Sequence, residues 1–551
     1  MISKASLIFT YVIYSVIYVN SQVVDISEHD MHPQFRDLPR SNNVRANELE
    51  AEIEYWRESA QERLRSKLQI ENSLNTNRAK NIIMFLGDGM SLPTVAATRM
   101  YMGGEEEQLS FEKFPHFGLS KTYCVDRQVA DSACTATAYL SGVKGNYGTI
   151  GVNAQVPRHD CLGETEESKR TVSIAKWAQD NCKATGIVTT SRVTHASPAG
   201  VYAHTANRDW ENDQDVTDAG CHDPRTKDIA LQLIEDDVGR NLKVVMGGGR
   251  REFRDRKIFD EEGEAGFRND DRDLIDEWLA EKRTRGNASY IWSNQGLKAI
   301  DHENTDYLLG LFEPSHCLYN IEIEQNNLQE TEPSLSEMTE AAIKVLQKEE
   351  NGYFLFVESA RIDLAHHDNL ARIALDETKE FSKTIDIARR MTSESDTLIV
   401  VTSDHAHVMS YNGYPRRGND ILGLSGRTGS DSLPYTTLSY GNGIGYYNAY
   451  ENGVRKNVAA LDWTNPYTAY MATAPRDSET HGGDDVGVYA LGPWSHLFIG
   501  AYEQSNIPVA MAYAAKIGPY VADSDETCSG GNALKLPLVL IVVIWLMRFM
   551  F

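Results

Sequence analysis

Five short apolar runs recur along the chain, and no other feature constrains its fold as strongly. They span residues 81–86, 184–190, 243–246, 353–357 and 397–402. Runs of this length without polar alternation are typical of strands that are buried on both faces of a sheet. Helical patterns lie between them, as in 338–346 and 374–388, where apolar residues recur every three or four positions. The alternation predicts an α/β fold with a large central, mostly parallel sheet flanked by helices.

Polar residues follow four of these runs directly. They are Asp88, the segment 191–197, Glu358 and the pair Asp404-His405. Parallel sheets bind ligands beyond the carboxyl ends of their strands, so these side chains are expected to meet in one site.

The two ends of the chain are apolar. Residues 1–21 have Lys4 near the start, an apolar run and small residues at the end, which predicts a secretory signal peptide. Residues 530–551 end in an apolar tail that follows Ser529 and Gly530, an order typical of a glycosylphosphatidylinositol (GPI) signal that is removed on attachment. A retained tail helix is the alternative, although the apolar stretch is short for a membrane span.

The composition, with 41% hydrophobic and 24% charged residues, is that of an ordinary globular protein. Residues 22–80 form an arm with a helical pattern, 81–413 and 480–525 form the catalytic α/β domain, and 414–479 form a loop-rich insertion with many Gly, Ser, Pro and Tyr residues.

The net charge of -25 disfavours nucleic-acid partners. Asn287 begins an Asn-Ala-Ser sequon and is the candidate for N-glycosylation. Secretion also permits disulfides among the seven cysteines.

Ser132 precedes a run of small, helix-forming residues that extends to Ala138. A serine at a helix N-terminus lies where backbone amides and the helix dipole favour an anion, so Ser132 is a candidate nucleophile. The alternative is that Ser132 only caps the helix. No GxSxG motif surrounds it, which argues against a serine-histidine-acid triad.

Three clusters of acids and histidines have the composition of a metal site. Asp363 and His367 are spaced i, i+4 and would share one face of a helix. Asp404 and His405 follow a buried strand, where charges need partners or a metal. His481 lies in a glycine-rich turn.

Taken together, these motifs resemble the alkaline phosphatase family, and in particular its animal membrane-bound branch. The likeness covers about residues 81–515 and rests on motifs that occur in the family's order. They are 88–90, 131–133, 194–198, 207–210, 358–367, 402–405 and 480–483. The resemblance implies hydrolysis of phosphate monoesters, with broad specificity, through a phosphoserine at Ser132.

The resemblance also implies which residues bind two zinc ions and one magnesium ion. Those of the first zinc are Asp363, His367 and His481. Those of the second zinc are Asp88, Ser132, Asp404 and His405. Magnesium would take Asp88, Ser197 and Glu358, with His195 acting on it through water. Arg208 would hold two phosphate oxygens with its planar fork, and an ion pair with Asp131 or Asp209 is the alternative.

Further implications of the resemblance concern structural features. A calcium ion would bind Phe312 through its backbone, Glu313 and Glu332, with Asp223 as a fourth candidate. Cys161 and Cys221 are expected to form a disulfide. Cys134 stands where the family usually has a glycine beside the nucleophile, and three outcomes are open: it crowds the pocket, it is oxidised, or it is a free thiol. The N-terminal helix and the crown-like insertion resemble the family's dimer contacts and imply a homodimer on the extracellular face of the cell membrane.

Two other readings remain open. A related phosphodiesterase or sulfatase could share the sheet, but a sulfatase needs a modifiable cysteine motif and a diesterase would prefer a threonine nucleophile and lack Arg208. A catalytically silent surface receptor could keep the fold, but it has no need for three complete metal sites.

Overall fold

The computed structural model describes residue 61 and residues 74–521. The predicted signal peptide, the helical pattern of the N-terminal arm and the lipid-anchor signal with Ser529 and Gly530 lie outside the described residues. In the part of the chain that is described, no helix is long and apolar enough to cross a bilayer.

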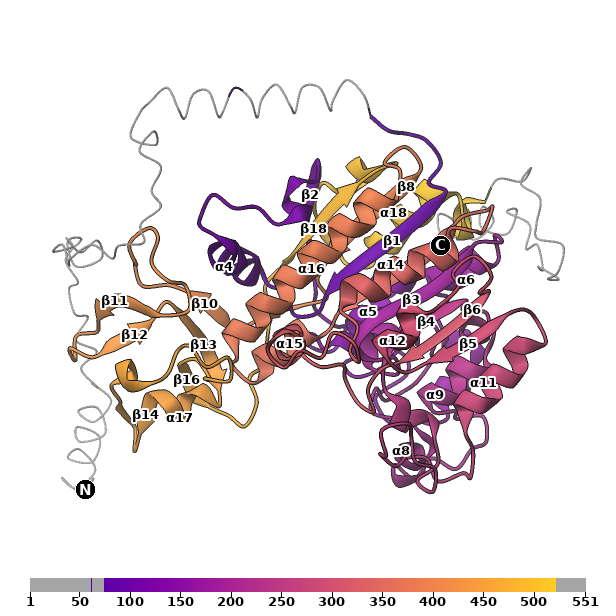
Figure 1. Ribbon diagram of the computed structural model, residues 1–551, viewed down its shortest axis with the longest axis horizontal. Helices are drawn as coiled ribbons and strands as arrows, with labels where there is room; N and C mark the ends of the chain where they lie inside the picture. Colours follow the sequence, from indigo (N-terminus) through magenta and orange to yellow (C-terminus); the bar gives the residue numbers. More distant parts are fainter. Residues whose placement is uncertain (1–60, 62–73, 522–551) are drawn as a thin grey trace, which may run out of the picture. The chain divides into compact units, whose positions relative to one another are not determined.

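A ten-stranded sheet forms the centre of the molecule, in the order β19-β2-β18-β8-β1-β7-β3-β4-β6-β5 (Figure 1). All five predicted runs are strands of this sheet. They are β1 (Asn81–Gly87), β3 (Ala184–Arg192), β4 (Val244–Gly248), β7 (Tyr353–Ser359) and β8 (Thr397–Thr402). The remaining strands are β2 (His116–Lys121), β5 (Ala288–Ile291), β6 (Tyr307–Leu311), β18 (Val486–Leu491) and β19 (Gly500–Glu503). Only β18 runs antiparallel to its neighbours within this sheet, which confirms the predicted α/β class.

Helices cover both faces of the sheet because successive residues of a buried strand point to opposite sides. Ile82, Met84 and Leu86 of β1 pack in one core with α5 (Ser132–Ser141), α6 (Ile174–Gln179), α9 (Ile229–Glu235), α11 (Leu274–Arg283) and α18 (Asn506–Ala515). Ile83 and Phe85 pack in a second core with α4 (Leu92–Met102), α14 (Leu335–Leu346) and α16 (Ala371–Met391). Both cores are buried and fix the sheet that carries the site.

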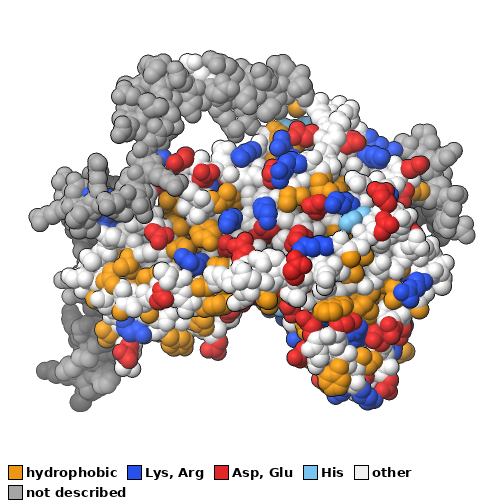
Figure 2. Space-filling view, viewed as in Figure 1, with side chains coloured by type: hydrophobic (Ala, Val, Ile, Leu, Met, Phe, Trp, Pro, Cys, Tyr) orange, Lys and Arg blue, Asp and Glu red, His pale blue; other side chains and the backbone are white. Residues whose placement is uncertain are grey.

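The insertion predicted at 414–479 has its own small sheet and apolar cluster. The sheet has three strands, which are β10 (Met409–Tyr411), β13 (Leu438–Gly443) and β16 (Ala472–Pro475). A hairpin of β11 (Leu424–Thr428) and β12 (Pro434–Thr436) and the short helix α17 (Gly445–Ala449) complete it (Figure 1). Leu438, Tyr440 and Tyr470 pack there against Ala371 and Leu375 of α16. Acidic and basic side chains are interspersed over the face that Figure 2 shows.

Candidate metal centre

The polar residues that follow the predicted strands lie together because β8, β1, β7 and β3 are consecutive in the sheet. Asp88 follows β1, Glu358 lies near the end of β7, and Asp404 follows β8. Ser197 lies on the short helix α7 (Ala196–Ala199), which follows β3. The neighbouring carboxyl ends bring these side chains to one edge of the sheet, as the pattern of runs indicates.

One cluster contains the three residues that the resemblance gave to the first zinc. Asp363 and His367 lie on α15 (Arg361–His367), and His481 lies on β17 (His481–Gly482). The Nε2 atoms of His367 and His481 are 3.0 Å apart, and that of His481 is 3.4 Å from Oδ1 of Asp363. His407, which the sequence did not single out, joins them, and one ligand atom of each lies within 4.8 Å of the others.

The rings of this cluster are oriented through their second nitrogen. Nδ1 of His367 donates to the Glu479 carbonyl at 2.7 Å, and Nδ1 of His481 donates to the Ala130 carbonyl at 2.7 Å. These bonds leave both Nε2 atoms as acceptors that face Asp363, which is the tautomer a metal requires.

The second cluster surrounds the predicted nucleophile. Nε2 of His405 lies 3.1 Å from Asp404 Oδ2, 3.6 Å from Asp88 Oδ1 and 3.3 Å from the hydroxyl oxygen of Ser132. Ser132 is the first residue of α5, and the side chain of Asp131 caps the helix by accepting from Cys134 N. The alternative that Ser132 is the cap is therefore wrong.

Glu358, one of the residues that the resemblance gives to magnesium, is completely buried. Its Oε2 atom accepts hydrogen bonds from Thr189 at 2.5 Å and from Ser191 at 3.2 Å. Burial raises its pKa to about 7, against the effect of the Thr189 bond and with a further contribution from Asp404. Burial, followed by the charges of Asp404 and Asp363, also raises the pKa of Asp88 well above its usual range.

The donor set fits metal ions because the unsatisfied atoms are those that would bind them. Buried oxygens without a hydrogen-bond partner are costly, and several lie in this centre. They are Asp88 Oδ1 and Oδ2, Ser197 Oγ, Glu358 Oε1 and Asp404 Oδ2. Carboxylates with imidazoles suit zinc, and the all-oxygen group of Asp88, Ser197 and Glu358 suits magnesium.

Arg208 reaches the same centre from a loop. Nη1 donates to Asp131 Oδ2 at 3.0 Å, and Nη2 donates to Nε2 of His195 at 3.1 Å. Of the two ion pairs given as alternatives for Arg208, the one with Asp131 is therefore present, whereas Asp209 contacts Arg158 at 2.7 Å. Burial, together with the charge of Arg208, lowers the pKa of His195 well below its usual range, so His195 is a neutral acceptor that orients the guanidinium.

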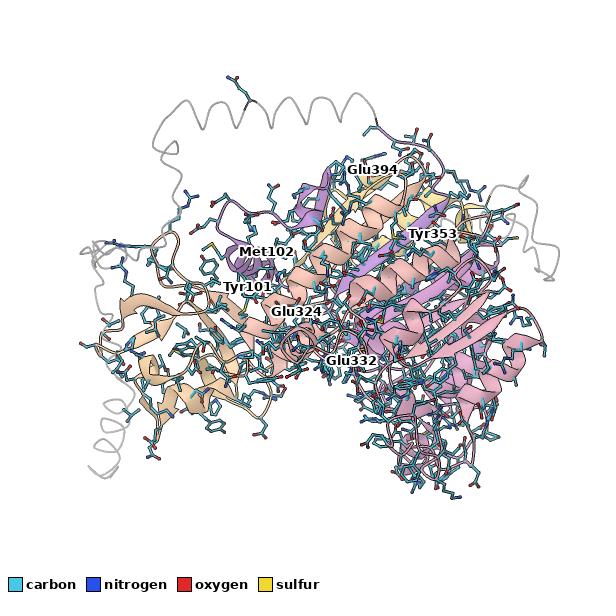
Figure 3. All side chains as sticks on the ribbon, viewed as in Figure 1. Tyr101, Met102, Glu324, Glu332, Tyr353 and Glu394 are labelled. Carbon is cyan, nitrogen blue, oxygen red and sulfur yellow. A yellow bond between two sulfur atoms is a disulfide. The ribbon has the colours of Figure 1, made fainter. Side chains whose placement is uncertain are left out.

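A second group of carboxylates lies at the predicted calcium position. Glu313 and Glu332, the latter labelled in Figure 3, interact with each other and with Glu262, which belongs to the loop before α11. Burial first and the neighbouring carboxylates second raise the pKa of Glu313 to about 7 and that of Glu332 to about 8. The fourth candidate, Asp223, pairs with Arg225 at 2.7 Å.

The described residues include two disulfide-bonded pairs of cysteines and an exposed sequon asparagine. Cys161 and Cys221 form a disulfide, the pair that the resemblance implied. Of the alternatives for Cys134, the free thiol is wrong, because Cys134 is oxidised to a disulfide with Cys124. Both sulfurs belong to a small buried cluster that the spacing of cysteines does not reveal. The side chain of Asn287 is exposed.

Solved structures of bacterial alkaline phosphatases share the fold. The enzyme from the Antarctic bacterium TAB5 is 22% identical with a TM-score of 0.55, over 80% of this chain and 99% of that chain. The Thermus thermophilus enzyme is 21% identical with a TM-score of 0.58, over 80% and 92%. The class that the architecture defines is thus the alkaline phosphatase fold.

Sequence comparison makes the assignment specific. The alkaline phosphatase family model matches residues 79–517. A membrane-bound alkaline phosphatase of Bombyx mori is 46% identical over 535 residues, which are 94% of this chain and 96% of that protein. The human tissue-nonspecific isozyme of alkaline phosphatase is 43% identical over 520 residues, which are 92% of this chain and 96% of that protein. The chain belongs to the alkaline phosphatase family and is a phosphoric monoester hydrolase.

Proposed function

We propose that the chain hydrolyses phosphate monoesters through a phosphoserine at Ser132, with two zinc ions and one magnesium ion. The observation that carries this proposal is the convergence of unsatisfied buried oxygens and paired imidazoles around one serine hydroxyl, with a guanidinium beside it. Residues remote in sequence supply these groups, and a structural role for any one of them would not require the others.

The proposed zinc ligands are Asp363, His367 and His481 for one ion and Asp88, Asp404, His405 and Ser132 for the other, and magnesium would bind Asp88, Ser197 and Glu358. When bound, these cations supply Lewis acidity that lowers the pKa of a hydroxyl and neutralises charge on a leaving oxygen.

The residues of the chain define two steps. The Oγ atom of Ser132 attacks phosphorus, so that an Oγ–P bond forms and the ester P–O bond breaks, and the departing alkoxide takes a proton and leaves as an alcohol. Water then attacks the same phosphorus, so that a new P–O bond forms and the Oγ–P bond breaks; a proton from the water returns to Ser132, and inorganic phosphate leaves. Arg208 holds two non-bridging oxygens in both steps, because Asp131 and His195 fix its planar fork.

A single substitution tests the covalent step. Ser132→Ala is expected to abolish trapping of radiolabelled phosphate on the denatured enzyme. Ser141→Ala, at the other end of α5, is the matched control and should trap phosphate as the wild type does. Equal labelling of Ser132→Ala and wild type would refute the proposal, and metal analysis of the same samples tests the proposed zinc and magnesium content.

The choice of substrate distinguishes the proposed monoester hydrolysis from its two alternatives, which are hydrolysis of phosphodiesters and of sulfate esters. Arg208 is proposed to pair with two non-bridging oxygens of a doubly charged monoester, whereas a diester and a sulfate ester each carry one negative charge fewer, so a monoester should be turned over much faster than either. Recognition that ends at the phosphoryl group implies broad specificity for the alcohol. Turnover of matched aryl monoester, diester and sulfate substrates checks this order.

The remaining parts of the proposal concern the setting of the enzyme. A calcium ion at Phe312, Glu313 and Glu332, with Glu262, would relieve the repulsion among these carboxylates. The Bombyx mori relative is described as membrane-bound, and this supports membrane association. The GPI anchor, the extracellular face and the homodimer are proposed from the family resemblance and the order of residues at the C-terminal end. Release from cells by a phosphatidylinositol-specific phospholipase tests the anchor, and ultracentrifugation tests the dimer.

A further inference from the structure

The Cys124–Cys134 disulfide closes a short loop that carries three contacts of the catalytic centre. Its cysteines are ten residues apart, and Ala130, Asp131 and Ser132 follow one another inside the loop. Each contacts a different partner: the Ala130 carbonyl accepts from His481 Nδ1 at 2.7 Å, Asp131 Oδ2 accepts from Arg208 at 3.0 Å, and Ser132 Oγ lies 3.3 Å from His405 Nε2. One loop therefore contacts a proposed zinc ligand of each cluster and the arginine, and it carries the nucleophile.

The middle of this loop runs over the surface. Residues 125–129 are all exposed, whereas Cys124, Ala130 and Cys134 form a buried cluster. Hydrogen bonds tie the start of the loop to the neighbouring segment, from Val125 N to the Gly145 carbonyl and from Tyr147 N to the Asp126 carboxylate. Exposed segments of this kind have the lowest local stability in a fold, so a covalent link across the ends removes many of their conformations.

The link also acts on the carboxylate that orients Arg208. Oδ1 of Asp131 accepts hydrogen bonds from Cys134 N at 3.3 Å and from Gly148 N at 3.0 Å, while Oδ2 accepts from Arg208. A displacement of Cys134 would therefore rotate Asp131 and move the guanidinium with it. The end of the surface segment packs beside the turn that holds His481, because a side chain at Gly483 would meet Val129 and Gln128.

We propose that the Cys124–Cys134 disulfide is a positioning element of the phosphate site, which holds Ala130, Asp131 and Ser132 in register with His481, Arg208 and His405. The proposal rests on the proposed phosphomonoesterase function. The disulfide touches no substrate; it acts through Asp131 on Arg208 and through the first turn of α5 on the nucleophile.

The double variant Cys124→Ala/Cys134→Ala tests this role, with Cys161→Ala/Cys221→Ala as the matched control that removes the other disulfide. The first variant should raise the inhibition constant for inorganic phosphate and lower kcat/KM by about tenfold or more, because small displacements of a positioned group have large effects. The control should change both quantities by a smaller factor than the first variant, because the Cys161–Cys221 disulfide does not close the loop that carries Ala130, Asp131 and Ser132. Circular dichroism and thermal unfolding verify that each variant is folded at the assay temperature.

A double-mutant cycle separates positioning from general destabilisation. In an Arg208→Ala background, removal of the Cys124–Cys134 link should raise the phosphate inhibition constant by a clearly smaller factor than in the wild type, because the route through Asp131 to Arg208 has already been lost while the route through α5 remains. An equal effect in both backgrounds would overturn the proposed route.

Amide hydrogen exchange gives a readout that does not depend on turnover. In the metal-loaded protein, exchange at residues 130–135 should accelerate in Cys124→Ala/Cys134→Ala and stay unchanged in the control. Unchanged exchange in a folded variant would overturn the inference whether or not the wild type hydrolyses phosphate monoesters. An inactive wild type with accelerated exchange in the variant would contradict the proposed function and keep the positioning role of the disulfide.

Discussion

The Nε2 atom of His407 lies 2.7 Å from Oδ1 of Asp363, and its Nδ1 atom lies 2.5 Å from Oε2 of Glu479. Burial lowers the pKa of His407, but the charge of Glu479 and the contact with Asp363 outweigh it and raise the pKa to about 10. Oε1 of Glu479 also accepts from Val408 N at 2.8 Å, which fixes the carboxylate. Glu479 thus orients His407, and His407 orients a carboxylate proposed to bind zinc.

The first prediction follows from this chain of contacts. Glu479→Gln removes the charge that holds His407, and we expect zinc affinity to fall by about 10- to 100-fold. Competition with a chromophoric chelator measures it. Glu503→Gln is the control, because Glu503 pairs with Lys121 and Lys144. Equal zinc affinity in Glu479→Gln and wild type would contradict this role.

Arg208→Lys is predicted to weaken phosphate binding although it keeps the charge. A lysine cannot reproduce the fork that Asp131 and His195 hold, so the KM for a monoester and the inhibition constant for phosphate should rise by about tenfold. Arg158→Lys should stay within about twofold of wild type, since Arg158 pairs with Asp209. Steady-state kinetics with product inhibition compares the two, and similar constants for both variants would argue against the clamp.

Calcium is predicted to stabilise the protein more at pH 8 than at pH 6. The pKa values of Glu313 and Glu332 rise on folding to about 7 and about 8, so without a cation their contribution to stability is greatest below the unfolded pKa and falls as pH increases through these values. Calcium offsets the charges that appear in this window. Thermal unfolding with calcium or with a calcium-selective chelator should show a larger shift of Tm at pH 8.

Two variants check which residues bind that calcium ion. Glu262→Gln should reduce the calcium-dependent shift of Tm, because Glu262 acts on both other carboxylates. Asp223→Asn should leave it intact, because Asp223 pairs with Arg225. The reverse pattern would restore Asp223 as the ligand.

Glu377 is predicted to make stability depend on pH at a position away from the metal centre. Burial raises its pKa to about 8, against the hydrogen bond from Asn320 N at 2.6 Å. Because the folded pKa exceeds the unfolded value, ionisation between these pH values destabilises the folded state, and Glu377→Gln should be more stable than wild type at pH 8 by on the order of 3 kcal/mol. The two proteins should differ little at pH 5. Denaturant unfolding in excess zinc measures both, and the exposed Glu394→Gln is the control (Figure 3).

The sequence predicted the elements whose signal is local. Buried parallel strands such as β1 and β8 are continuous apolar runs, and the ligands at their ends stand in the order of a known family. β2 was missed because its residues alternate between buried and exposed positions and include no such run. β5 was missed because it is short and mostly half-buried.

The missed site residues depend on contacts across the fold. His407 lies opposite His481 because β9 (Ala406–His407) pairs with β17. The spacing of His405 and His407 does not predict this pairing, and neither does that of Glu479 and His481. Two histidines in alternate positions after a buried strand are nevertheless a signal for a metal site. Glu262 approaches Glu313 from a long loop, and the partner of Cys134 could not be derived from spacing alone.

His366 ties the inserted sheet to the helix that carries the proposed zinc ligands. Its Nδ1 atom lies 2.9 Å from the hydroxyl of Tyr440 on β13, and its Nε2 atom lies 3.0 Å from Thr94 Oγ1 on α4. Tyr470 N also donates to the Asn369 carbonyl, two residues beyond His367. Substitutions in the insertion would therefore change the position of α15 and, with it, the rate of turnover. The insertion contains none of the proposed ligands, and its outer loops tolerate sequence change.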